Sequence, residues 1–259
     1  MLGWQIFVHS VRMVIRNWRQ ALRIGLIPST LIAVLTFIFH GSQAIGSTNQ
    51  SWFAWFESMS SAGQAGFALV VVGNLFVILW VFVAWHRFVL LEEYPNGWIP
   101  PLHAMYLGQY LKQGVKVLAV AFVVSFLISF VCLLVLVFLT SASSLPRGVL
   151  NLPPLVSSFI SFFVVFRLGI TFPATAIGQT LSMKNAYYFT KGKAGSLLFL
   201  AIVQLTGIFL AEVIIGVVAS FLPMLSLAAD VVFHLFFSLV HVSVWTTMYG
   251  VFVEKRELA

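Results

Sequence analysis

Five polar side chains interrupt long apolar stretches of this sequence, and their types could do chemistry. They are Asn74, Arg167, Glu212, His234 and His241. Ionisable groups inside a bilayer are costly, so they usually pair with one another or line a path for ions or protons. A carboxylate and two imidazoles are also zinc ligands, but no short motif such as HExxH brings them together. We therefore expect neither a metal site nor a cofactor, and interpret these residues as polar contacts between helices, with Arg167 or His234 as the partner of Glu212.

The densest group of ionisable residues is His86, Arg87, Glu92 and Glu93. His86 could act as a general base oriented by Glu93. We favour the alternative that Arg87 and its neighbours lie at the level of the lipid headgroups. A pair between Arg87 and Glu92, five residues apart, is not expected unless the helix breaks near Pro95. The sequence also lacks a phosphate-binding loop and a nucleophile elbow, so we predict no catalytic residues.

Four arginines near the N-terminus are spaced by four, three and four residues, which places them on one face of a helix. Apolar residues, among them Ile6, Val14 and Trp18, occupy the other side. The pattern predicts an amphipathic helix over residues 1–23 at the membrane surface, acting either as an anchor alone or as a site for anionic headgroups. The residues predicted to lie at headgroup level are Arg12, Arg16, Arg19, Arg23, Arg87, Lys112, Lys116, Lys191 and Lys193.

The composition indicates that lipid surrounds the elements that position these residues. Of the 259 residues, 61% are hydrophobic and 8% are charged, whereas a soluble domain carries about 25% charged residues. The mean hydropathy is +1.03. We predict an all-α, polytopic membrane protein whose six transmembrane helices form three hairpins with interfacial amphipathic helices, in a single domain over residues 1–259. The predicted crossings are 24–40, 65–86, 117–139, 154–177, 196–220 and 228–252.

The distribution of Lys and Arg predicts the orientation. The N-terminus has four, the loop after the second crossing three, the loop after the fourth three and the C-terminal tail two, whereas Arg147 alone falls on the opposite side. Because basic residues concentrate on the cytoplasmic side, we predict that both termini are cytoplasmic. The net charge of +7 is thereby explained by anionic lipid, and nucleic acid is not expected as a partner. An alternative is a signal peptide cleaved near Ser42-Gln43-Ala44, which would leave five crossings.

A faint repeat relates the three predicted hairpins. Arg87 and Arg167 occupy corresponding places near the inner ends of the second and fourth crossings, and Thr247 stands there in the sixth. Pro173 follows Arg167 by six residues and cannot donate a backbone hydrogen bond. We therefore predict a kinked helix end in which the freed carbonyl of Gly169 accepts from Arg167.

The segments Arg167–Ala174 (RLGITFPA) and Ala186–Gly192 (AYYFTKG) resemble a group of bacterial membrane proteins. The group includes the YciC-like uncharacterised inner-membrane proteins and the membrane domain of some glycerophosphodiester phosphodiesterases. The resemblance implies a six-helix fold in the bacterial inner membrane. The chain has Ala176-Ile177-Gly178 where those proteins often carry a glutamate, and no phosphodiesterase domain is attached, so that activity is not implied.

Three functions remain open from the sequence. The leading one is a non-enzymatic inner-membrane accessory, scaffold or lipid-interacting protein, with anionic lipids and another membrane protein or complex as partners. A transporter or permease subunit is the second, and it requires Asn74, Arg167, Glu212 and His234 to converge on one cavity. An intramembrane lipid-modifying enzyme centred on His86, Arg87 and Glu93 is the third.

Overall fold

The computed structural model describes residues 2–42, 56–142 and 152–258, and within these ranges the chain consists of helices and their connections, without strands. Arg147 and the Gln43-Ala44 part of the alternative cleavage site lie outside the described residues. The all-α fold class is confirmed for the described part. The helices are α1 (Leu2–Arg16), α2 (Trp18–Ser42), α4 (Ser61–Leu91), α5 (Ala104–Ala142), α6 (Leu152–Leu168), α7 (Thr171–Ala176), α8 (Met183–Phe189), α9 (Ala194–Phe221) and α10 (Pro223–Phe252).

Four of these helices are long and apolar enough to cross a membrane. They cover Ser61–Leu91, Ala104–Phe138, Ala194–Phe221 and Val231–Phe252. A helix of about 20 apolar residues spans the hydrocarbon core, and only internally bonded backbone is stable there. The fold therefore defines a helical membrane protein. Crossings by α2 and by the shorter α6 stay predictions.

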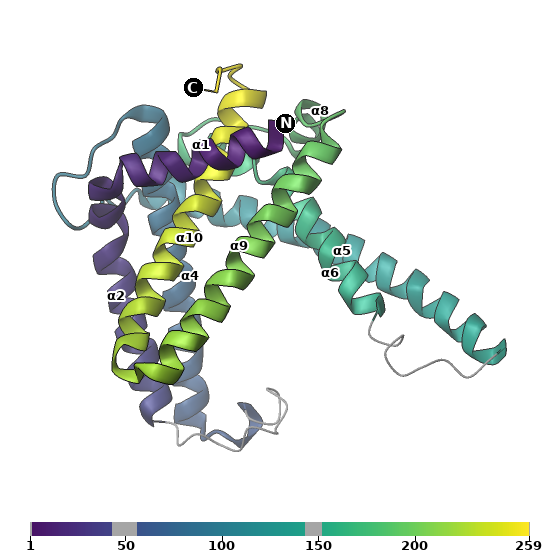
Figure 1. The fold of residues 1–259 in the computed structure, drawn as a ribbon, viewed down its shortest axis with the longest axis horizontal. Coiled ribbons are helices and arrows are strands. Elements are labelled where there is room, and N and C mark those ends of the chain that lie inside the picture. The colour runs from purple at the N-terminus through teal and green to yellow at the C-terminus, as the bar shows by residue number, and fades with distance from the viewer. Residues whose placement is uncertain (1, 43–55, 143–151, 259) are drawn as a thin grey trace.

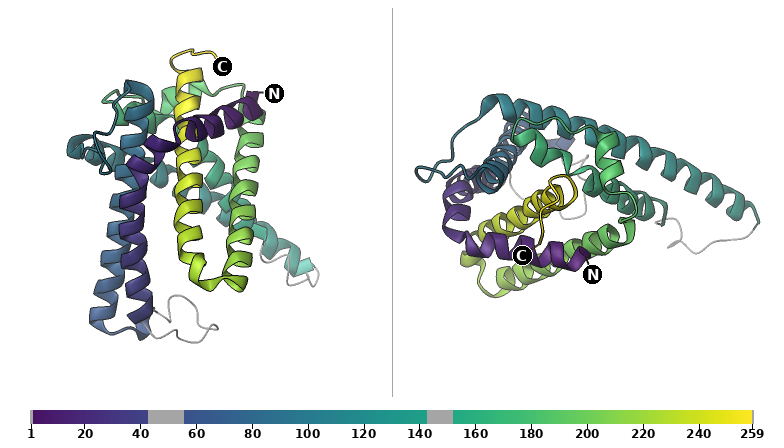
Figure 2. Two further views of the ribbon diagram at one scale, coloured as in Figure 1. Left: turned by 60° about the vertical axis from the view of Figure 1, so that its left-hand side comes forward. Right: turned by 90° about the horizontal axis from the view of Figure 1, so that it is seen from above.

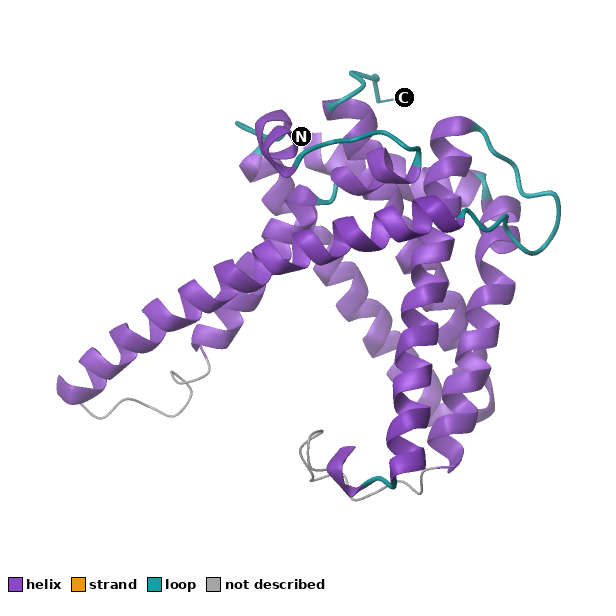
Figure 3. Cartoon of the chain, turned by 180° about the vertical axis from the view of Figure 1, so that it is seen from behind, coloured by secondary structure: helices purple, strands orange, loops and turns teal. Residues whose placement is uncertain are grey.

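The helices form a bundle with one projecting pair. Helices α2, α4, α9 and α10 run alongside one another, and α1 lies across the end of the bundle at which both termini are found (Figures 1 and 2). We call this the terminal end. Helices α5 and α6 pack together and extend away from the bundle (Figure 3). In its most apolar stretch α10 is 56% buried and α5 only 11%, so α10 lies at the centre and α5 presents most of its surface to the surroundings.

The predicted helix over residues 1–23 is two helices. Helix α1 ends at Arg16 and α2 begins at Trp18, and between them the side-chain amide of Asn17 donates to the carbonyl of Met13 at 2.8 Å. Asparagine commonly bonds nearby backbone in this way and so competes with helix continuation. The apolar side also differs from the prediction, because Ile6 and Val14 are buried within the protein instead of facing lipid.

The predicted crossing 154–177 is likewise not one helix. Helix α6 ends at Leu168, and after Gly169 and Ile170 the short α7 begins. A Cβ on Gly169 would lie 1.9 Å from the indole nitrogen of Trp245 in α10, so only glycine permits the chain to pass so close to α10. Pro173 falls in the first turn of α7, where a missing backbone N–H is tolerated. Where a kink was predicted, the helix is therefore fully interrupted between Leu168 and Thr171.

Candidate functional site

Arg87 is held by protein groups at the terminal end. Helix α4 ends at Leu91, about one turn after Arg87. Glu92 follows in the left-handed backbone conformation, with φ 55°. The chain thereby returns Glu93 to Arg87, whose Nε donates to Glu93 Oε2 at 2.8 Å. Glu93 Oε1 lies 2.5 Å from His103 Nε2, and Arg87 Nη1 donates to the carbonyl of Ala176 at 3.0 Å. The helix therefore breaks before Pro95, and this break allows Arg87 to form a local ion pair. Its partner is Glu93 and not Glu92.

His86 is not oriented by Glu93, so the catalytic interpretation was wrong in its geometry. The imidazole is fully buried. Its Nδ1 lies 2.8 Å from Thr246 Oγ1, and its Nε2 lies 3.2 Å from the hydroxyl of Tyr110. Because Thr246 donates its own proton to the carbonyl of Val242, Nδ1 is the donor to Thr246 and Nε2 accepts from Tyr110. No ring nitrogen is left to accept a substrate proton.

Arg167 is held in a similar way to Arg87. Its Nε donates to Thr190 Oγ1 at 2.7 Å and its Nη2 to the carbonyl of Tyr187 at 3.3 Å. The predicted acceptor was wrong, because Arg167 donates to Thr190 and Tyr187 instead, and the carbonyl of Gly169 accepts from the backbone N–H of Phe172. Both arginines also stack on a tyrosine: Arg87 lies 4.6 Å from the ring of Tyr106, and Arg167 lies 4.0 Å from that of Tyr187. A cation over an aromatic face at this distance is attractive.

The sequence reasoning did not identify these tyrosines, although their spacing carries a signal. Tyr106 follows Arg87 by 19 residues and Tyr187 follows Arg167 by 20. At the corresponding place in α10, Thr247 instead lies 3.0 Å from Ser10 Oγ in α1. Each of the three corresponding positions thus contacts a segment at the terminal end, and the third contact returns to the first helix of the chain.

Glu212 and His234 meet, whereas Arg167 lies elsewhere. Glu212 Oε1 is 3.7 Å from His234 Nε2 across α9 and α10, and both side chains are more than half exposed. Among the described residues no ion pair links Glu212 to Arg167. His241 is apart from both, since it packs against Phe166 and Trp245. In the described part of the chain no three His, Cys, Asp or Glu residues come close enough to bind a metal ion.

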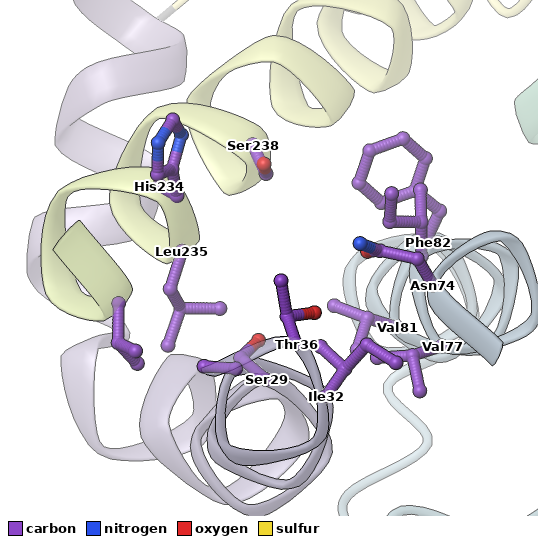
Figure 4. Close-up of a pocket in the computed structure, with 13 residues that line it drawn as sticks. Ser29, Ile32, Thr36, Asn74, Val77, Val81, Phe82, His234, Leu235 and Ser238 are labelled. Carbon is purple, nitrogen blue, oxygen red and sulfur yellow. The ribbon is translucent and has the colours of Figure 1, made fainter. Parts of the chain in front are cut away.

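A cavity of about 600 Å³ lies between α2, α4 and α10. Two of the polar residues singled out in the sequence, Asn74 and His234, line it together with Ser29, Thr36 and Ser238 (Figure 4). Arg167 and Glu212 do not line it. A transporter path was expected to bring Asn74, Arg167, Glu212 and His234 to one cavity. Two of the four, Asn74 and His234, share this one.

An apolar groove of about 300 Å³ lies nearer the terminal end, between the α1–α2 junction and α10. Trp18, Leu22 and Leu26 line one side, and Leu235 and Leu239 line the other. The guanidinium of Arg19 lies 5.5 Å from the centre of the Trp18 ring. All four N-terminal arginines are exposed, and so are the lysines predicted at headgroup level, namely Lys112, Lys116, Lys191 and Lys193.

No family model, no curated protein and no solved structure matches the chain. The fold and its apolar helices define the class, a polytopic helical membrane protein. The resemblance to the YciC-like proteins stays a prediction.

Proposed function

We propose that the chain is a non-enzymatic, lipid-interacting protein of the bacterial inner membrane, which holds anionic phospholipid at its terminal end. The proposal includes six crossings, with α2 and α6 as the additional two, and a cytoplasmic location for both termini. The excess of basic residues near the termini and in the connections at their side supports this orientation. Accessory or scaffold activity toward another membrane protein is compatible with this function.

The observation that carries the proposal is the position of an arginine row beside the apolar groove. Trp18 lines the groove and its ring also lies beneath the guanidinium of Arg19. Arg23 is exposed one helical turn further along α2. A phospholipid has the complementary shape, because an acyl chain fits an apolar groove while its phosphate meets cations at the rim. By contrast, Arg87 and Arg167 are already bound to protein groups and contribute little to a headgroup site.

The test compares phospholipids bound to two charge-matched variants. The protein is purified in a mild detergent, supplied with phosphatidylglycerol or phosphatidylcholine, and bound lipid is counted by native mass spectrometry. Arg19→Gln with Arg23→Gln should weaken phosphatidylglycerol binding roughly thirtyfold, since each of the two charges near an anionic surface contributes about 1 kcal/mol. Lys191→Gln with Lys193→Gln removes two exposed cations that do not border the groove and serves as the control.

The proposal fails if both double variants lose the same amount of phosphatidylglycerol, because the cations would then act only through net charge. It also fails if the unmodified protein binds phosphatidylcholine equally well. The same preparation reveals any co-purifying membrane protein, which would add an accessory role.

A transporter or permease subunit is the second candidate. The cavity that contains Asn74 and His234 favours it, because convergent polar side chains within membrane-length helices commonly mark a substrate path. Arg167, however, lies outside that cavity and is bound to Thr190. The anionic-lipid proposal does not require Arg167 to line a cavity.

A further inference from the structure

The cavity between α2, α4 and α10 contains the amide of Asn74, which has no hydrogen-bond partner in the described part of the chain. Asn74 lies near the middle of α4, and its side chain makes no hydrogen bond to any described residue. Figure 4 shows it directed into the space shared with Ser29 of α2 and Ser238 of α10. A polar group deprived of hydrogen bonds in an apolar environment is costly. The cavity must therefore admit something that bonds the amide.

The charges around the cavity exclude a strongly ionic occupant. No Lys, Arg, Asp or Glu is among its described lining residues, and His234 is the one titratable group there. The carboxylate of Glu212 lies 3.7 Å from His234 Nε2 but does not line the cavity. An anion or a cation in the cavity would consequently lack an opposite charge. Hydroxyl or amide groups suit the lining better, because they can both donate and accept, and the carbonyl oxygen of an ester can accept from the amide N–H of Asn74.

Apart from Thr36, the rest of the lining is aliphatic or aromatic and includes Ile32, Val77, Val81 and Phe82. The volume of about 600 Å³ falls within the range of about 300–1,000 Å³ found for small-molecule sites, which are mostly apolar with a few placed polar groups. The side chain of His234, which lines the cavity, is 56% exposed. A molecule with an apolar chain can thus enter from the bilayer.

We propose that this cavity binds a neutral amphiphile, namely a single-chain lipid with an uncharged, hydroxyl-bearing head, and that Asn74 is its principal polar contact. Ser29 and Ser238 lie on the two other helices and complete a set of hydrogen-bonding groups around the head. The aliphatic residues of α2 and α4 pack against the chain. This site shares Leu235 with the groove proposed for anionic phospholipid, but none of the N-terminal arginines lines it, so binding here does not depend on them.

The experiment uses the full chain in phosphatidylcholine nanodiscs with a monoacylglycerol that carries a photoreactive diazirine on its acyl chain. After irradiation, the labelled peptides are identified by mass spectrometry. We expect label on the lining segments of α2, α4 and α10, and at least a tenfold reduction by excess unlabelled monoacylglycerol. Asn74→Leu and Ser238→Leu should each reduce this competed label about tenfold. Ser220→Leu makes the same change at an exposed position of α9 and should leave it unchanged.

Two further variants keep the outcome decisive. Asn74→Gln retains the amide and should restore part of the competed label if Asn74→Leu acts through hydrogen bonding. Ser29→Leu tests the site from α2 should Asn74→Leu prove unstable. Label that concentrates on the exposed surface of α5 and is not reduced by competitor would overturn the proposal, and so would equal labelling of Asn74→Leu and the unmodified protein. Arg19→Gln with Arg23→Gln should not alter the label, which separates a failure here from a failure of the anionic-lipid site.

Discussion

At the terminal end, His86, Arg87 and Arg167 are each bonded to groups from other helices, whereas in the opposite half of the bundle Asn74, Glu212 and His234 face a cavity or the surroundings. All six residues are polar and lie on or beside apolar helices, so residue type alone does not separate them. For Asn74, which bonds to no described residue, the difference is the supply of protein partners. Loops, α7 and α8 bring carbonyls, hydroxyls and a carboxylate to the terminal end, whereas the described residues that line the cavity all belong to α2, α4 and α10.

This comparison indicates that polar side chains have two roles in the bundle. Where partners are complete, a polar side chain fixes the packing of helices, and its removal should destabilise the protein. Where no described partner is present, as at Asn74, the side chain is available to a ligand, and its removal should cost binding but not stability. Three substitutions test this division by measuring unfolding of the purified protein in a mild detergent.

The largest effect is expected at the break between α6 and α7. Gly169→Leu would place a side chain where the indole of Trp245 lies, since even a Cβ would come within 1.9 Å of it. Overpacking of this kind costs about 3 kcal/mol, and we expect a clear fall in the unfolding midpoint. Gly216→Leu is the control, because a Cβ there meets nothing within 4 Å. Equal midpoints for the two variants would show that the break is not held by close packing against α10.

Arg87→Gln should have the next largest effect. It removes the ion pair to Glu93 and the bond to the Ala176 carbonyl, and it leaves a carboxylate that is only 29% exposed without its arginine. Loss of one partner from a partly buried pair should cost about 2 kcal/mol. Lys116→Gln changes charge equally at an exposed position of α5 and should cost less than about 0.5 kcal/mol. If Lys116→Gln destabilises as much as Arg87→Gln, net charge and not the specific contacts stabilises this end.

Much of the fold could be predicted from the sequence, and the failures have local causes. Long apolar runs such as Ser61–Leu91 give helices of membrane length because lipid leaves the backbone no other way to satisfy its hydrogen bonds. The breaks at Asn17 and Gly169 were missed, since one depends on a side chain bonding to Met13 and the other on contact with a tryptophan 76 residues later. Periodicity within a segment contains neither kind of information.

The candidate sites were predictable only in part for the same reason. Asn74 and His234 could be found because their residue types are unusual in apolar helices. Ser29 and Ser238 are ordinary small residues of such helices, and only the packing of α2, α4 and α10 reveals that they share a cavity. The groove beside Arg19 likewise joins two distant parts of the chain. The arginine spacing indicated a membrane surface, but it did not indicate that α10 supplies one side of the groove.

The smallest predicted effect is a gain in stability, whereas the two preceding substitutions should each cause a loss. This difference in sign makes it the sharpest test of the division between the two halves. Asn74→Leu replaces an amide that bonds to no described residue with an aliphatic side chain of similar size. In ligand-free protein this should raise the free energy of unfolding by about 1 kcal/mol, because the cost of an unsatisfied polar group is removed. Monoacylglycerol should then stabilise the unmodified protein but not the variant, as expected when a ligand binds only the folded state. A variant that is less stable than the unmodified protein without ligand would show that Asn74 holds the helices together, and the division between the two halves would fail at the residue on which it depends most.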